Sequence, residues 1–150
     1  MVTVFKDSDR EALLSRFTRL KRDQAPLWGT LTAPEMVVHL ADQLRMALGD
    51  VTCDPIPGVW HNPIFKAAFL YLPSRMLWVK NQKRPPEAFA TQPETWEKAI
   101  DTLLELMERL VARMHAGDWP DHPNLGTMTR HGWGVFTYRH FDHHLRQFGV

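Results

Sequence analysis

The sequence predicts an all-α protein, a four-helix bundle with a long, partly helical crossover between its second and third long helices. Three observations lead to this prediction. Apolar residues recur at helical spacing in four segments. Helix-capping residues stand in front of these segments. A proline-rich stretch over 50–92 separates the second segment from the third, which is long enough for the two middle helices to run parallel.

The first two helices are bounded by capping signals. A capping box that begins at Ser8 is expected to open a helix over about 8–24. A second capping box pairs Thr32 with Glu35, and the helix that follows is expected to stop at Gly49, a residue that favours the left-handed end of a helix.

The remaining helices follow the proline-rich stretch. A short helix is expected over 63–72, resumed after Pro73 through about Val79. A third capping box beginning at Thr91 is expected to open the third long helix, which Gly117 ends. The fourth is expected over about 130–148.

Length and composition indicate a single domain over residues 1–150. The 44% hydrophobic and 23% charged residues are typical of a soluble globular protein, and a net charge of +1 gives no reason to expect nucleic acid as a partner. No apolar run approaches the roughly 20 residues of a membrane span. The single cysteine excludes an internal disulfide, and the N-terminus lacks the pattern of a signal peptide, so a cytoplasmic location is expected.

Two histidines of the last helix, His140 and His144, are four residues apart and therefore neighbours on one helix face. His39 lies seven residues after Thr32, while the pair lies eleven and fifteen after Thr129. At about 1.5 Å rise per residue, the three imidazoles lie at the same height along the bundle axis if the two helices are antiparallel. If the helices are parallel, the heights of His39 and the pair differ by about 9 Å. The crossover arrangement makes these helices antiparallel.

Three neutral imidazoles around an open position are the ligand set of catalytic zinc, and a more open facial set also suits nickel, iron or manganese. The expected cofactor is a divalent metal, with zinc or nickel as first candidates and iron or manganese as alternatives. No carboxylate stands at a matching position, so water or substrate would complete the coordination. The alternative is that these histidines are ordinary core or surface groups.

Several other side chains are candidates for the pocket or for orienting the ligands. His143 forms a competing pair with His140, while Trp133 shares the face of His140 and Gln43 that of His39. Asp42 could orient water or an imidazole, although a surface salt bridge explains it equally. Aromatic and polar residues at such spacing are more often plain core or surface.

Two further features have mainly solvent-facing interpretations. His122 and His131 stand in a loop and at a helix start, where they are expected to face water. Basic residues in the crossover could attract an anionic substrate or could simply belong to a solvated loop; they are Arg75, Lys80, Lys83 and Arg84.

His140, the pair His143-His144, and Gln147 resemble the last-helix signature of the DinB-like superfamily, which includes the YfiT-type proteins. Leu145 and Arg146 replace the Arg and Gly that usually precede that Gln, and the chain therefore looks like a less studied branch. The resemblance implies a metal-binding four-helix bundle in up-down-down-up order, often dimeric. It also places the metal ligands at the same three histidines, His39, His140 and His144, with Gln147 close to them.

The resemblance also implies a class of chemistry, because related proteins are metal-dependent transferases or isomerases that use low-molecular-weight thiols such as bacillithiol or mycothiol. The first hypothesis is therefore a metal-dependent thiol transferase or hydrolase acting on a small molecule, in a protein that could form a homodimer. The second is a non-catalytic stress protein that binds a metal or a small apolar ligand. Fold analogy alone does not choose between them.

Overall fold

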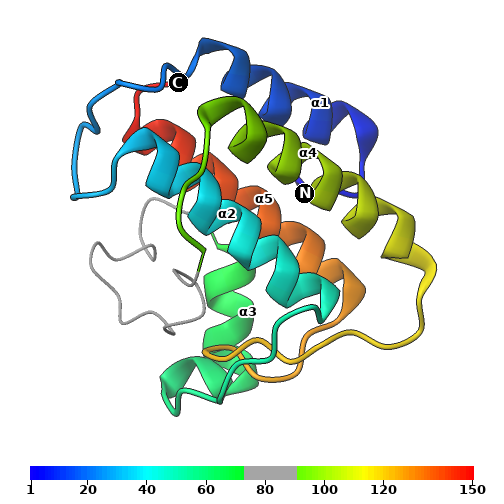
Figure 1. Cartoon of the computed structure of the whole chain (residues 1–150). Coiled ribbons are helices and arrows are strands. Elements are labelled where there is room, and N and C mark those ends of the chain that lie inside the picture. The colour runs from blue at the N-terminus through cyan, green and yellow to red at the C-terminus, as the bar shows by residue number, and fades with distance from the viewer. Residues whose placement is uncertain (73–90) are drawn as a thin grey trace.

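The computed structural model describes residues 1–72 and 91–150, and its regular secondary structure in these ranges is entirely helical (Figure 1). The all-α prediction is therefore confirmed. The α-helices are α1 (Asp7–Leu14), α2 (Ala33–Leu48), α3 (Pro63–Tyr71), α4 (Trp96–Ala112) and α5 (Arg130–Gln147). The short 3-10 helices are η1 (Ser15–Arg19), η2 (Val59–His61) and η4 (Arg113–His115).

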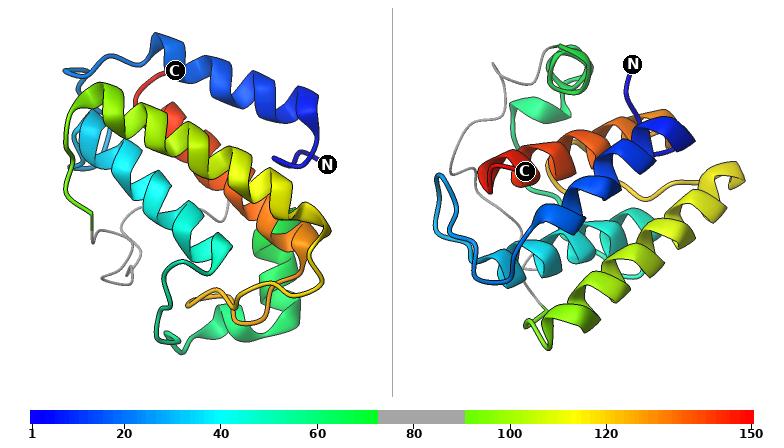
Figure 2. Two further views of the ribbon diagram at one scale, coloured as in Figure 1. Left: turned by 45° about the vertical axis from the view of Figure 1, so that its right-hand side comes forward. Right: turned by 90° about the horizontal axis from the view of Figure 1, so that it is seen from above.

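The second helix, α2, packs against both α4 and α5. The colour gradient in Figures 1 and 2 shows that α2 and α4 run in the same direction and that α5 runs against both. The helix α1 contacts α5, and α3 lies across one end of the molecule, where it also contacts α5. No helix in the described ranges is long and apolar enough to cross a membrane.

The two helices that carry the candidate ligands begin in the same way. Thr32 caps α2 by accepting a hydrogen bond from the backbone N–H of Glu35, whose side chain completes the predicted capping box. Thr129 caps α5 in the same role. Three residues before each cap, Gly29 and Gly126 adopt positive φ angles of 83° and 64°. The starts of α2 and α5 are therefore built alike, whereas α4, whose start was expected to match that of α2, is capped differently.

The first helix starts where it was expected to within one residue, but the predicted capping box at Ser8 and the predicted end near residue 24 are wrong. It begins at Asp7 without a side-chain cap, and Ser8 is the second residue of the helix. One reason is that the carboxylate of Asp9 bonds back to the N–H of Thr3, which ties the preceding segment to the first turn. The α-helix ends at Leu14 and continues only as η1, far short of residue 24.

The predicted capping box at Thr91 is also wrong. Thr91 donates hydrogen bonds to Asp42 from its backbone N–H, at 3.1 Å, and from its hydroxyl, at 2.6 Å. The hydroxyl of Thr95 caps α4 instead, by accepting from the N–H of Lys98 at 3.3 Å. A buried carboxylate on another helix thus anchors the residue that local sequence signals favoured as a cap.

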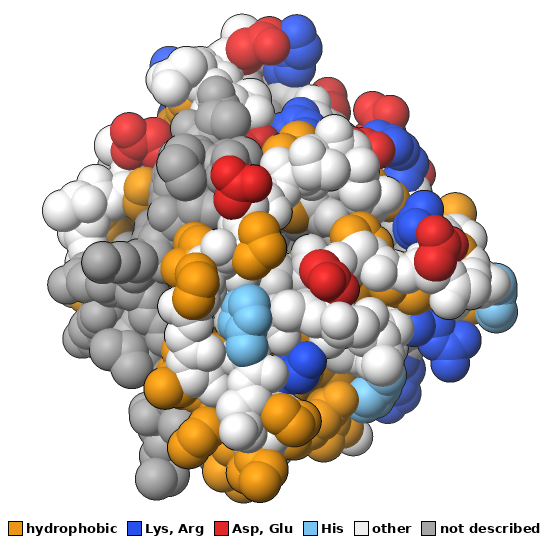
Figure 3. All heavy atoms as spheres, turned by 90° about the horizontal axis from the view of Figure 1, so that it is seen from below, with side chains coloured by type: hydrophobic (Ala, Val, Ile, Leu, Met, Phe, Trp, Pro, Cys, Tyr) orange, Lys and Arg blue, Asp and Glu red, His pale blue; other side chains and the backbone are white. Residues whose placement is uncertain are grey.

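The helix predicted over 63–72 is present as α3, whereas its expected continuation to Val79 and the basic residues of 75–84 lie outside the described residues. The guanidinium of Arg139 fixes the end of α3 by donating to the carbonyls of Phe69, at 2.8 Å, Leu70 and Leu72. Large apolar side chains remain exposed along η2 and α3, and hydrophobic side chains gather on the face shown in Figure 3. The large apolar residues that are exposed on these two helices are Val59, Ile64, Phe65 and Tyr71.

The N-terminal segment packs tightly on α5 at a glycine. The N–H of Val4 donates to the carbonyl of Gly134 at 3.2 Å. A Cβ at Gly134 would stand 2.4 Å from both the ring of Phe5 and the hydroxyl of Thr3. The close approach of this segment to the helix therefore depends on the missing side chain.

Candidate metal centre

Three imidazoles meet in the interface between α2 and α5. The Nε2 atom of His140 lies 3.1 Å from Nε2 of His39 and 3.1 Å from Nε2 of His144. The three rings are buried, with 3%, 9% and 2% of their surface exposed for His39, His140 and His144 respectively. One nitrogen from each residue lies within 4.8 Å of the other two, so the three are close enough to bind one metal ion.

The spacing of these nitrogens fits a metal ion. For an ion about 2.0–2.1 Å from each nitrogen, a typical zinc–imidazole distance, the 3.1 Å separations correspond to an angle of roughly 100° at the ion. That angle lies between the roughly 90° of an octahedral face and the roughly 109° of a tetrahedron. These two separations therefore suit both geometries and do not select among zinc, nickel, iron and manganese.

Gln147 connects one of the three histidines to the chain that precedes α2. Its Oε1 lies 2.8 Å from Nδ1 of His144, and its Nε2 donates to the carbonyl of Trp28 at 2.6 Å. The backbone also joins these segments, because the N–H of Leu27 donates to the carbonyl of Gln147 at 2.7 Å. Gln147 therefore contacts a candidate ligand directly, on the side of the ring that faces away from the other histidines.

The next turn of the α2–α5 interface holds a polar pair and an aromatic ring. Gln43, four residues after His39, donates from Nε2 to the hydroxyl of Thr137 at 3.2 Å, and both side chains are buried. The ring of Phe136 lies 5.5 Å from that of His140. On this side, the described residues therefore place a buried polar pair and an aromatic ring next to the histidines.

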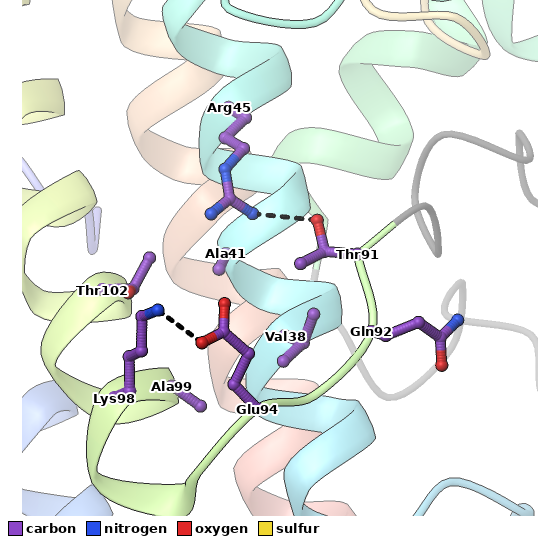
Figure 4. Close-up of a pocket in the computed structure, with 9 residues that line it drawn as sticks. All are labelled: Val38, Ala41, Arg45, Thr91, Gln92, Glu94, Lys98, Ala99 and Thr102. Carbon is purple, nitrogen blue, oxygen red and sulfur yellow. Dashed lines mark hydrogen bonds and ion pairs between the residues drawn. The ribbon is translucent and has the colours of Figure 1, made fainter.

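Asp42 does not join the three histidines. Its carboxylate accepts hydrogen bonds from Arg45 at 2.7 Å and from Thr91, and its side chain is only 3% exposed. The surface salt bridge considered for it is therefore a buried one, and it attaches the start of the segment before α4 to α2. Figure 4 shows Arg45 and Thr91 together at a pocket between α2 and that segment. None of the candidate ligands lines this pocket.

Trp133 and His143 occupy different positions around the three histidines. Trp133 is fully buried, donates from its indole N–H to the carbonyl of Pro120 at 2.8 Å, and packs 5.9 Å from Phe136, so it belongs to the core beyond the polar pair. His143 is half-buried, with its ring 6.2 Å from Trp28 and 5.2 Å from His144. His144, rather than His143, is the residue that groups with His140.

The expectation that His122 faces water is wrong. Its ring is buried against Phe136, 4.5 Å away, and its Nδ1 accepts a hydrogen bond from the N–H of Asn124. Burial, with a smaller contribution from nearby His61, lowers the pKa of His122 to about 3. A turn fixes the backbone at this position, because the N–H of His122 donates to the carbonyl of Gly126 at 2.9 Å.

His131, in contrast, is exposed as expected, with its ring stacked 5.9 Å from that of Tyr71. It stands in the first turn of α5, away from the position of the three buried histidines on the same helix.

The chain belongs to the family described as "Protein of unknown function (DUF1569)", whose model matches residues 5–149. No curated protein and no solved structure matches the chain.

Proposed function

We propose that this DUF1569 protein binds a divalent metal ion through His39, His140 and His144 and uses it in catalysis on a small molecule. The observation that carries the proposal is the convergence of three buried Nε2 atoms from two helices, with both measured separations at 3.1 Å. A neutral imidazole can donate the lone pair of an unprotonated ring nitrogen to a metal ion, and one cation can be bound by three such nitrogens at once.

The ligand set favours a catalytic ion over a structural one. Structural zinc sites have four protein ligands, whereas catalytic sites have three and leave a position for water or substrate. Within residues 1–72 and 91–150, no carboxylate or thiol groups with the three histidines. Neutral ligands leave the full charge of the ion in place, and that charge, when the ion is bound, lowers the pKa of an adjacent water or thiol.

The chain's own residues would prepare the site for such chemistry. Phe136 covers one side of His140 and limits access of water there. Gln43 lies one turn from His39, and its buried Oε1 accepts no hydrogen bond from the described parts of the chain. A small molecule that carries a hydrogen-bond donor would satisfy this oxygen. Thiol transfer and hydrolysis remain the two reaction classes, with a low-molecular-weight thiol or water as the nucleophile.

We also infer that α1, α2, α4 and α5 form an up-down-down-up bundle of the DinB-like type. The opposite directions of α2 and α5, and the parallel directions of α2 and α4, support this inference. The expected homodimer stays a prediction, which the mass of the protein in solution would test.

Metal binding is tested with protein purified without an affinity tag. Elemental analysis and titration of the chelator-treated protein with zinc, nickel, iron(II) and manganese should give one ion per chain for at least one metal. Replacing any one of the three histidines by alanine should greatly weaken binding. His143→Ala is the matched control, because it removes an imidazole next to His144 without touching the group of three. A folded wild-type protein that binds none of these ions would end the proposal.

A second candidate function is non-catalytic metal binding, which the burial of the three rings favours, since none is more than 9% exposed. The two functions differ in ligand exchange. In cobalt-substituted protein, a catalytic site should change its visible spectrum when a small thiol is added, and the loaded protein should transfer that thiol to an aryl halide or hydrolyse an activated ester. An unchanged spectrum with no turnover would leave metal binding alone.

A further inference from the structure

We propose that Gln147, held in place by the Trp28–Gly29 backbone, fixes His144 in the tautomer that presents a lone pair to the metal centre. Gln147 and Gly29 are positioning residues, since neither belongs to the group of three histidines. The role of this contact in metal binding rests on the proposed function, whereas the contact and the tautomer are properties of the metal-free protein. Trp28 and Gln147 are 119 residues apart in the chain, so the contact is a feature of the fold.

The direction of each hydrogen bond follows from the backbone. The carbonyl of Trp28 can only accept, so the group of Gln147 that lies 2.6 Å from it must be the amide NH₂. The amide oxygen of Gln147 then faces Nδ1 of His144 at 2.8 Å, and an oxygen of this kind can only accept. Nδ1 of His144 therefore carries the hydrogen. In the neutral ring, Nε2 then carries a lone pair.

This tautomer determines what can lie between the three rings. The Nε2 lone pair of His144 can accept a hydrogen from Nε2 of His140, 3.1 Å away. If it does, His140 has no lone pair left at that atom for His39, which is also 3.1 Å from it. One linear N–H···N hydrogen bond therefore satisfies only one of the two contacts, whereas one cation can accept a lone pair from each ring. The orientation set by Gln147 prepares the site for a cation before the ion arrives.

Gly29 is the residue that allows Gln147 to take this position. Its φ of +83° favours glycine, and a Cβ there would stand 2.4 Å from Nε2 of Gln147. Gly49, at the end of α2, provides a matched comparison. Its φ is +80°, but a Cβ there would meet only Pro120, at 3.6 Å. Alanine at either position introduces similar backbone strain, and only Gly29→Ala also displaces Gln147.

The tautomer is measured directly in the chelator-treated protein. Nitrogen-15 chemical shifts and long-range couplings of the imidazole ring distinguish Nδ1–H from Nε2–H, and at pH 8 an unperturbed imidazole is neutral. We expect His144 to be Nδ1–H in the wild type and to lose this fixed state in Gln147→Met. An Nε2–H tautomer in the wild type would overturn the proposal without any variant, and so would an unchanged tautomer in Gln147→Met.

Zinc affinity provides the second readout. Loss of a hydrogen-bond partner behind a ligating histidine typically weakens metal binding about 10–100-fold. We expect this loss in both Gln147→Met and Gly29→Ala, and wild-type affinity in Gly49→Ala. In a Gln147→Met background, adding Gly29→Ala should weaken zinc binding no further, because both changes remove the same contact.

The outcomes separate this inference from the proposed function. If the wild type binds no metal but His144 is Nδ1–H and depends on Gln147, the positioning holds and the metal site fails. If the wild type binds zinc and both Gln147→Met and Gly29→Ala bind it equally tightly, the metal site holds and the positioning fails. Additive losses in the double variant would also overturn the role assigned to Gly29.

Discussion

Acidification of the metal-free protein should reduce its stability through His122, a residue outside the metal centre. The ring is buried against Phe136 and Trp133, with centroid distances of 4.5 Å and 5.4 Å, and its Nδ1 accepts a backbone hydrogen bond. Burial lowers the pKa of His122 to about 3, whereas an imidazole in the unfolded chain titrates near 6.5. Between these values the unfolded chain binds a proton that the folded chain does not.

The sign and size of the effect follow from this difference. Stability that is present above pH 6.5 is lost progressively as the pH falls toward 3, because protons favour the unfolded state throughout that window. At about 1.4 kcal/mol per pH unit below 6.5, lowering the pH from 8 to 5 removes about 2 kcal/mol from the free energy of unfolding. For a chain of 150 residues this corresponds to a fall of about 4–8 °C in Tm.

The assay is urea unfolding of the chelator-treated protein at pH 8, 7, 6 and 5, with His122→Asn as the comparison. The amide oxygen of asparagine can keep the hydrogen bond to the N–H of Asn124, but the side chain does not titrate. The difference between the two pH profiles isolates His122, because the substitution removes no other ionisable group. Whatever its stability at pH 8, the variant should lose about 2 kcal/mol less than the wild type when the pH falls to 5. Parallel profiles would refute the burial of a neutral imidazole at this position.

Three further predictions test the packing around the centre. In urea unfolding, Gly134→Ala should destabilise the protein by about 1–3 kcal/mol, because its Cβ would overlap the N-terminal segment. The control Gly132→Ala, whose Cβ meets nothing closer than 3.4 Å, should be neutral or slightly stabilising. Equal losses of stability in the two variants would contradict this packing. Arg139→Met should speed hydrogen exchange in α3 much more than in α2, because three carbonyls at the end of α3 lose their donor, and uniform exchange would argue against that role. Asp42→Asn should lower the free energy of unfolding by about 1–3 kcal/mol, because it weakens the buried hydrogen bonds from Thr91, yet the number of metal ions bound per chain should not change. A loss of bound metal would show that Asp42 belongs to the metal site.

The sequence could predict that the three imidazoles lie at the same height along the bundle, because the height of a side chain depends only on where its helix starts and on the rise per residue. Thr32 and Thr129 are strong caps, and both cap their helices in the structure. Once a helix start is fixed, the rise per residue determines the height of every later side chain. Only the relative direction of the two helices had to come from elsewhere, and the length of the crossover suggested it.

The features that the sequence missed depend on contacts between distant segments. Thr91 has the better local capping signal, but Asp42 on another helix takes both of its donors, so Thr95 caps α4. His122 stands in a loop by every local signal, and only its packing against α5 buries it. The position of Gln147 could be noted in the sequence, but its partner in the segment before α2 could not, because nothing local links them.

The proposal that one ion is bound by three imidazoles is tested most directly by X-ray absorption of the zinc-loaded protein. We predict a first shell of nitrogen and oxygen at about 2.0–2.1 Å with multiple scattering from three imidazoles, falling to two in His144→Ala if any zinc remains bound. His143→Ala should give the wild-type spectrum. A sulfur shell at about 2.3 Å, or the same imidazole count in the wild type and in His144→Ala, would contradict the proposed centre.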